Sequence, residues 1–242
     1  MQVVSLSFFH FPKGASRLWA FAMMGLARRG LRRTVGIGFW KLCGSGTGEG
    51  FTPVPNTGVY AILATWTDLD TARHQTDATP VFRAYHARSD ESWTVFLTPT
   101  SVRGAWSGHI PFSAAPIVSA PESGAKSGPI AALTRATVRP ARAIRFWQRV
   151  PDISAMIGQN PDALFKIGIG EVPLLHQITF SIWPDTSSMA RFARESGPHA
   201  SAIRAVRDGD WFREELYARF RILGDRGTWM GRSPLNAFGT TS

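Results

Sequence analysis

"TGVYAILATW" (57–66) and "LLHQITFSIW" (174–183) are the two stretches that decide the fold of this chain. Each is a run rich in apolar and β-branched residues, as in a buried β-strand, and each ends on a tryptophan. Two residues after the tryptophan stands an aspartate, Asp68 in one stretch and Asp185 in the other, which is a residue type that caps helices. A strand followed by a capped helix therefore occurs twice.

Other segments repeat in the same order along the chain. The matching pairs are Pro80 with Trp93 against Pro198 with Trp211, "RGAWSG" (103–108) against "RGTWMG" (226–231), and "FWKLCGSGTGE" (39–49) against "LFKIGIGE" (164–171). Tryptophan is rare, so its recurrence at matching positions is hard to obtain by chance. The sequence therefore predicts an internal duplication.

Both halves predict the element order β-α-β-β-α-β. In the first half we expect strands at 2–9, 36–42, 57–66 and 91–98, and helices at 15–29 and 68–88. In the second half we expect strands at 133–140, 164–169, 174–183 and 216–223, and helices at 141–150 and 186–207, the latter broken at Gly197-Pro198. This order predicts an α+β fold of two tandem ferredoxin-like units, arranged like a dimeric α/β barrel.

The predicted domain division follows from the repeat. Residues 1–108 form the first ferredoxin-like copy with its Gly-rich loop, and residues 132–242 form the second copy. Residues 109–131 are rich in Pro, Ala, Ser and Gly with few charges, which is typical of a linker.

The formal net charge of the chain is +10, which favours an anionic partner. No zinc-finger spacing, RNP motif or helix-turn-helix is present, so we expect no nucleic acid. The segment 16–33 combines a bulky apolar body with several arginines, which suits peripheral contact with a membrane. The alternative is a core helix with a basic C-terminal end, which the helix dipole favours.

We expect an intracellular protein without a membrane span. No apolar run reaches the roughly 18 residues of a transmembrane helix. The longest run, "LWAFAMMGLA" (18–27), lacks the basic leader and the small-residue cleavage site of a signal peptide. The single cysteine, Cys43, excludes an intrachain disulfide, and we expect it to be a small buried apolar residue.

The glycine-rich stretch "CGSGTGEG" (43–50) has the spacing of neither a dinucleotide fingerprint nor a phosphate-binding Walker loop. Prolines follow it, and the next predicted element is a strand, so no helix can begin there. Its glycines allow tight turns and close backbone approach to a bulky group. Gly44, Gly46 and Gly48 are therefore candidate cofactor contacts, and a plain hairpin connection is the alternative.

The six histidines form none of the paired motifs of zinc hydrolases or di-iron oxygenases. A single histidine can still hold a haem iron. His199 is the best candidate, because it shares an expected helix face with Ile203 and Val206. The alternative for His199 is a hydrogen bond near a helix N-terminus. His176, on an expected strand, is either a second cofactor contact or a core histidine.

Four long stretches resemble the spheroidene monooxygenase family, bacterial carotenoid ketolases of photosynthesis gene clusters. They are "FWKLCGSGTGEGFTPVPNTGVYAIL", "ESWTVFL", "NPDALFKIGIGEVPLLHQITFSIWPD" and "GPHASAIRAVRDGDWFREELYARFRILG". The resemblance implies a monooxygenase that introduces a keto group at C-2 of spheroidene-type acyclic carotenoids by two successive hydroxylations. It also implies haem iron, O2 and a reduced ferredoxin-type electron donor, whose acidity the basic surface would suit.

These expectations place the protein in the cytoplasm, peripheral to the photosynthetic inner membrane. Two alternatives remain at this point. One is a non-catalytic haem- or carotenoid-binding protein of the same duplicated fold. The other is a cofactor-free oxygenase, which is the weaker alternative because a saturated methylene is not easily oxidised.

Overall fold

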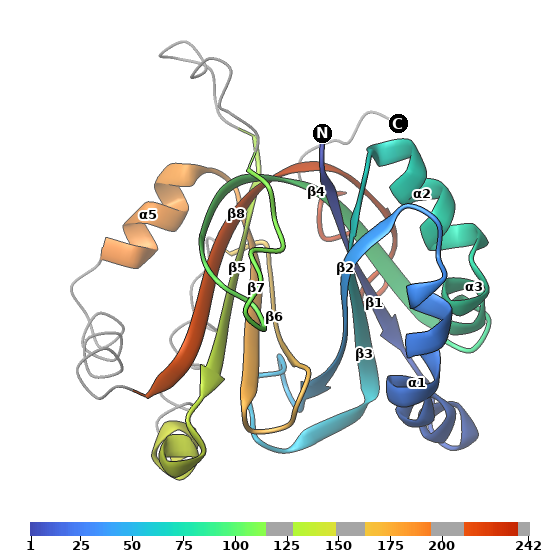
Figure 1. The fold of residues 1–242 in the computed structure, drawn as a ribbon, viewed down its shortest axis with the longest axis horizontal. Helices are drawn as coiled ribbons and strands as arrows, with labels where there is room; N and C mark the ends of the chain where they lie inside the picture. The colour runs from blue at the N-terminus through green and yellow to red at the C-terminus, as the bar shows by residue number, and fades with distance from the viewer. Residues whose placement is uncertain (115–127, 149–162, 195–210, 237–242) are drawn as a thin grey trace.

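Eight strands close into one antiparallel barrel in the order β1-β3-β2-β6-β7-β5-β8-β4 (Figure 1). The computed structural model describes residues 1–114, 128–148, 163–194 and 211–236. The strands are β1 (Val3–His10), β2 (Ile37–Gly46), β3 (Pro55–Trp66), β4 (Glu91–Gly104), β5 (Ile130–Val138), β6 (Phe165–Gly170), β7 (His176–Trp183) and β8 (Phe212–Gly227). The helices are α1 (Ala15–Arg32), α2 (Leu69–Ala78), α3 (Pro80–His86), η1 (Pro140–Arg142), which continues as helix to residue 148, and α5 (Thr186–Arg194).

The register of the strands confirms the two tandem ferredoxin-like units. In the first copy β1 pairs with β3 so that Val3 lies opposite Trp66, and in the second β5 pairs with β7 so that Ile130 lies opposite Trp183. The two copies join through β2 with β6 and through β4 with β8. The expected barrel is therefore present, while the exact domain boundaries stay a prediction.

Several predicted element bounds were wrong. The strands β4 and β8 extend well beyond the expected 91–98 and 216–223, because they pair with each other along most of their length. The expected helix 68–88 is two helices, since Thr79 adopts an extended conformation before Pro80. The C-terminal parts of the expected helices 141–150 and 186–207 lie outside the described residues.

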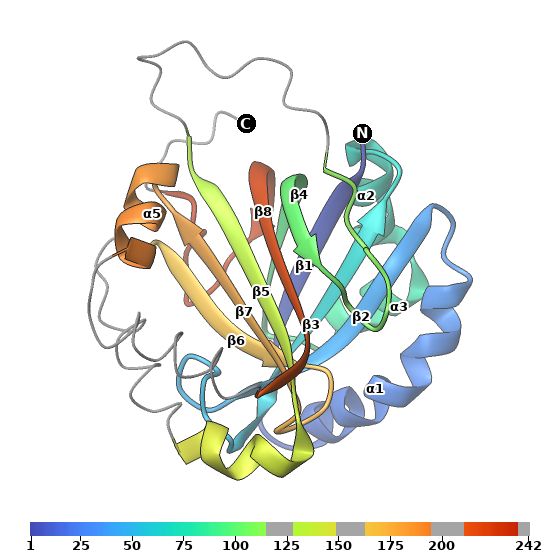
Figure 2. The same cartoon turned by 60° about the vertical axis from the view of Figure 1, so that its left-hand side comes forward.

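Alternating side chains fill the interior of the barrel. Every strand contributes apolar residues on its inward face, and their cluster includes Leu6, Phe8, Trp93, Ile167, Phe180 and Phe220. Helices α1, α2 and α3 cover the outer face of the first copy, as Figure 2 shows, over a second apolar cluster. Among the described residues, no helix combines the length and hydropathy needed to cross a bilayer.

The repeated "RGxWxG" motifs form two equivalent loops that bury or partly bury a tryptophan against the barrel core. Trp106 in the first loop and Trp229 in the second both pack on the interior cluster. Each loop turns through a residue with positive φ, Ser107 at 55° and Met230 at 57°. One glutamate accepts two backbone N–H groups of each loop: Glu214 from residues 107 and 108, and Glu91 from residues 230 and 231.

Candidate functional site

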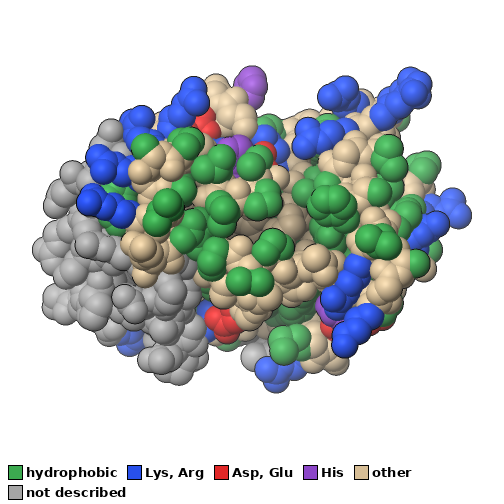
Figure 3. All heavy atoms as spheres, turned by 90° about the horizontal axis from the view of Figure 1, so that it is seen from below, with side chains coloured by type: hydrophobic (Ala, Val, Ile, Leu, Met, Phe, Trp, Pro, Cys, Tyr) green, Lys and Arg blue, Asp and Glu red, His purple; other side chains and the backbone are tan. Residues whose placement is uncertain are grey.

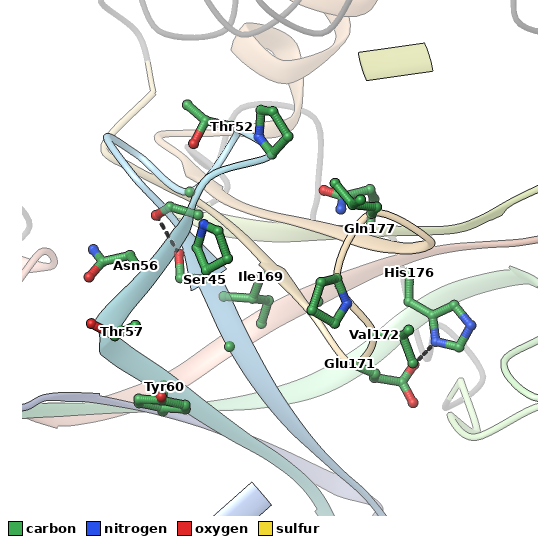
Figure 4. Close-up of a pocket in the computed structure, with 18 of the residues that line it drawn as sticks. Ser45, Thr52, Asn56, Thr57, Tyr60, Ile169, Glu171, Val172, His176 and Gln177 are labelled. Carbon is green, nitrogen blue, oxygen red and sulfur yellow. Dashed lines mark hydrogen bonds and ion pairs between the residues drawn. The ribbon is translucent and has the colours of Figure 1, made fainter. Parts of the chain in front are cut away.

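A groove of about 420 Å³ lies on the outside of the barrel where the two copies meet (Figure 4). Its walls come from segments far apart in the sequence: α1, the end of β2 and the start of β3, the turn between β6 and β7, and the helical residues 143–148. The lining includes Phe21, Met24, Gly44, Gly46, Gly50, Tyr60, Trp147, Gly170, Glu171, Leu174, His176 and Gln177. Most of these side chains are apolar or small, which suits a hydrophobic ligand.

The glycine-rich loop forms the floor of this groove by joining the two copies. Gly44 pairs with Gly170 across β2 and β6. Farther along, the Gly168 N–H donates to the Glu49 carbonyl at 2.8 Å, and the Ser45 hydroxyl donates to the Gly168 carbonyl at 2.7 Å. A Cβ on Gly50 would lie 2.0 Å from the Gly168 carbonyl oxygen, so the backbones approach more closely than any side chain permits.

The turn between β6 and β7 forms the opposite wall. Leu174 has a φ of 66°, an uncommon conformation for a bulky residue, and it is exposed. The Trp147 indole N–H donates to the Leu174 carbonyl at 2.9 Å, which ties the turn to the helical segment 143–148. Local hydrogen bonding therefore holds an apolar side chain at the edge of the groove.

Glu171 lies at the end of the groove and belongs to a buried charged cluster inside the barrel. Its carboxylate accepts a hydrogen bond from the Trp106 indole at 2.6 Å and pairs with the Lys41 ammonium at 2.7 Å. The His176 Nδ1 lies 3.6 Å away, which is too long for a hydrogen bond but within ion-pair distance when the imidazole is protonated (Figure 4). Arg135, almost fully buried, lies 3.8 Å from the same carboxylate and also pairs with Glu214.

The cluster contains residues of both copies, and its Lys41–Glu171 pair has a counterpart in Lys166 and Glu49, but its arginine and its histidine have none. Arg135 occupies the position that Phe8 holds in the first copy, and His176 occupies the position of Val59. Phe8 and Arg135 each pack on the tryptophan of one "RGxWxG" loop. An arginine buried where the equivalent residue is phenylalanine costs desolvation, and the pairing of Arg135 with Glu171 and Glu214 offsets that cost and distinguishes this end of the barrel from its counterpart.

Burial alone would raise the pKa of Glu171, but the adjacent His176, Lys41 and Trp106 outweigh it and lower the pKa to about 2. A carboxyl whose pKa falls on folding stabilises the fold above its unfolded pKa, and this stability is lost as pH falls through the folded value. We therefore expect Glu171 to contribute about 2–3 kcal/mol that disappears between roughly pH 5 and pH 2.

Urea unfolding as a function of pH checks this contribution. Glu171→Gln should be less stable than the wild type at pH 7, and the difference should shrink toward pH 2. Glu49→Gln, which removes a glutamate whose side chain is half exposed, controls for loss of a glutamate in general. A constant difference between Glu171→Gln and the wild type at every pH would contradict the assignment.

The outer face of the second-copy sheet lacks the bulky side chains of the first. Where the first copy has Phe9 and Tyr60, the second has Ala136 and Gln177, and where the first has Ile62 and Phe96, the second has Thr179 and Arg219. In the first copy these residues are buried beneath helices. The second copy therefore has less side-chain volume on the face that its helices would cover.

Comparison with known proteins identifies the family. The chain is 51% identical over 236 residues to "Spheroidene monooxygenase" of Cereibacter sphaeroides, which covers 97% of this chain and 71% of that protein. It is 49% identical to the Rhodobacter capsulatus protein of the same name, over 97% of this chain and 96% of that protein. The chain belongs to the spheroidene monooxygenase family. The protein of that name from Rubrivivax gelatinosus is 32% identical over 220 residues, 90% of this chain and 81% of that protein. No protein-family model matches the chain.

Solved structures support the fold of this spheroidene monooxygenase family member. An aldoxime dehydratase superposes with a TM-score of 0.58 at 10% identity, over 91% of this chain and 81% of that one. A second aldoxime dehydratase, in complex with butyraldoxime, superposes with a TM-score of 0.54 at 12% identity, over 91% of this chain and 79% of that one. At such low identity the likeness concerns the fold alone.

The structure brings together three of the residues that the sequence suggested for this family member. Gly44, Gly46 and His176 line the same groove. Gly48 lies in the turn beyond β2, with a φ of 65°, and is not among the residues of the groove. His199 lies outside the described residues. Their roles as cofactor contacts stay predictions.

Sequence reasoning missed the charged cluster of Lys41, Arg135, Glu171 and Glu214. Aligning the two copies residue by residue gives the signal, because Arg135 stands against a buried phenylalanine.

Cys43 is fully buried beside the cluster, and burial, with the Glu171 charge, raises the pKa of its thiol. It is thus an inert apolar residue, as expected. Within the described ranges, no three His, Cys, Asp or Glu side chains group to hold a metal ion.

Proposed function

We propose that this chain introduces a keto group at C-2 of a spheroidene-type acyclic carotenoid by two successive hydroxylations of one carbon. The observation that carries the proposal is the identity of about half of all residues, along almost the whole chain, with two proteins named spheroidene monooxygenase. A second hydroxylation at the same carbon gives a geminal diol, which loses water to leave the ketone. The reaction class is that of an oxidoreductase.

The apolar groove between the copies supports a carotenoid substrate. It is lined by Phe21, Met24, Tyr60, Trp147 and Leu174, and it is open at one side. Such walls hold a long polyene by apolar burial, without specific polar contacts along its length. Gly170 and Gln177 belong both to the groove and to the outer face of the second-copy sheet, so a chain lying in the groove reaches that face.

We infer that haem binds over this outer face of the second copy. The side chains there, among them Ala136 and Thr179, are smaller or more polar than those at the matching first-copy positions, which favours a flat group over this face. Arg219 and Arg221 are exposed on the same face, and guanidinium groups bind carboxylates such as haem propionates well. These features of the described residues support a porphyrin as the proposed ligand of this face.

His199 is the residue we propose as the proximal ligand. Its equivalent in the first copy, Val81, is buried in the cluster between the helices and the sheet. Haem, when bound with O2 and a reduced donor, supplies the oxidising power that removal of hydrogen from a saturated carbon requires. In this proposal the protein would orient the carotenoid, exclude water through the apolar groove walls and hold the iron through the His199 imidazole.

A ferredoxin-type protein is the electron donor that this proposal requires. The net charge of +10 favours docking of an acidic protein, and such pairing raises the association rate more than the affinity. We expect electron delivery to slow as ionic strength rises, because salt screens the attraction.

Expression in a spheroidene-accumulating bacterial strain that lacks its own ketolase tests the proposed function. Cells that receive this gene should convert spheroidene to the 2-keto product under aerobic conditions, and chromatography of extracted pigments with mass detection measures it. A strain with the empty vector is the control. Accumulation of unchanged carotenoid, with the protein present and folded, would instead indicate a non-catalytic binding protein.

A further inference from the structure

Exposed apolar side chains gather on one face of the molecule. They come from four segments: α1, the loop between β2 and β3, helical residues 143–148 and the turn between β6 and β7. The residues, which we call the docking face, are Leu18, Phe21, Val54, Ile144, Val172 and Leu174, each 41% exposed or more. Figure 3 shows hydrophobic side chains across the middle of the lower face of the molecule, around a hollow. Contiguous apolar surface of this kind marks an interaction site.

The mouth of the groove opens within this docking face. Phe21, Val172 and Leu174 line the groove and are also among the exposed apolar residues. Leu174 holds its side chain there in spite of a positive φ. A second hollow of about 350 Å³, lined by Ile144 and Trp147, lies beside the mouth and shares Leu174 with the groove. A ligand that enters the groove therefore crosses the docking face.

Basic side chains surround the apolar centre. Arg142 and Arg145 are exposed on either side of Ile144, and no carboxylate of the described residues pairs with them. Arg28 and Arg29 are exposed on later turns of α1. Figure 3 shows Lys and Arg side chains mainly toward the edge of the face. An apolar centre with a basic rim matches an anionic bilayer, whose acyl layer lies beneath negative headgroups.

We propose that the docking face lies on an anionic lipid bilayer and that the groove opens directly into its acyl layer. The ligand then passes from membrane to groove without crossing water. The identity of this ligand as a carotenoid rests on the proposed function, whereas docking of the face on the bilayer does not. A second copy of the chain is a poorer occupant, since a self-complementary contact would bring the two basic rims together.

Binding to vesicles tests the docking face, with two valines as a matched pair. Val54 lies on the face and is 58% exposed, while Val35 is 76% exposed at the opposite end of β2, near α2. Val54→Asp should weaken cosedimentation with vesicles of phosphatidylcholine and phosphatidylglycerol roughly tenfold, because a charge replaces a side chain that enters the acyl layer. Val35→Asp should bind like the wild type. Pure phosphatidylcholine vesicles, or high salt, should also reduce binding.

Two formats of the carotenoid separate docking from chemistry. With carotenoid in anionic vesicles, Val54→Asp should form ketone more slowly than the wild type, and with carotenoid in detergent the two proteins should be equal. Equal binding of Val54→Asp, Val35→Asp and wild type to anionic vesicles would overturn the docking proposal. A Val54→Asp protein with a changed oligomeric state but unchanged vesicle binding would also overturn it. The same holds for a Val54→Asp protein that loses binding to an acidic ferredoxin but not to vesicles. Absence of ketone in both formats would contradict the proposed function and leave vesicle binding as a separate result.

Discussion

Gly50→Ala is expected to destabilise the protein by about 2–5 kcal/mol, because it adds backbone strain to overpacking where the two copies join. Gly50 has a φ of 90°, and its added Cβ would lie 2.0 Å from the Gly168 carbonyl oxygen and 2.6 Å from the Ser45 hydroxyl. It would also lie 2.7 Å from the Gly168 carbonyl carbon, so two of the three nearest atoms belong to the β6 backbone, which cannot move without separating the strands. Urea unfolding followed by tryptophan fluorescence measures the loss.

Gly48→Ala is the matched control in the same loop. Gly48 also has a positive φ, of 65°, but no atom lies within 4 Å of its added Cβ. We expect only the backbone cost of about 1–2 kcal/mol. Similar small losses in both variants would contradict the close approach of Gly50 to Gly168, and with it the role of the loop in joining the copies.

His199→Ala is expected to abolish both haem binding and ketone formation. If His199 is the proximal ligand, its loss leaves no imidazole to hold the iron, and the product should fall to the level of a reaction without protein. The Soret absorbance of purified protein, titrated with haem, reports the binding directly. Circular dichroism should show an unchanged fold, and added imidazole should restore part of the absorbance.

His74→Ala controls for histidine loss in general. His74 is exposed on α2 of the first copy, away from the groove, so this variant should bind haem and form ketone like the wild type. A His199→Ala protein with a normal Soret band would contradict the proposed ligand. If His176→Ala loses the Soret band instead, His176 is the ligand and the haem iron lies in the groove.

The duplication could be predicted because the matching positions of the two copies include tryptophan, a rare residue. Trp66 and Trp183 occupy equivalent positions in the structure, and the two "RGxWxG" motifs form equivalent loops. The long pairing of β4 with β8 could not be predicted, because it joins segments more than a hundred residues apart. The backbone hydrogen-bonding groups of these strands find their partners only when the barrel closes.

The site was harder to predict than the fold. The glycines predicted close backbone approach, and Gly50 does approach the backbone of Gly168 in the other copy, while cofactor contact by Gly44, Gly46 and Gly48 stays a prediction. The periodicity of a single sequence does not mark Arg135 as a site residue. Its charge interrupts an apolar strand face, but the pattern does not show which groups neutralise that charge. Glu171 and Glu214 reach it only after β5, β6 and β8 have paired.

The most direct test of the central claim uses the purified protein with haem, a chemical or ferredoxin reductant, spheroidene in anionic vesicles and isotopically labelled dioxygen. Rapid extraction and mass spectrometry then follow the carotenoid. The account predicts a 2-keto product whose oxygen comes from the labelled gas, with no product when haem or reductant is left out. A ketone that forms equally without haem, or no ketone from a haem-loaded protein, would contradict it.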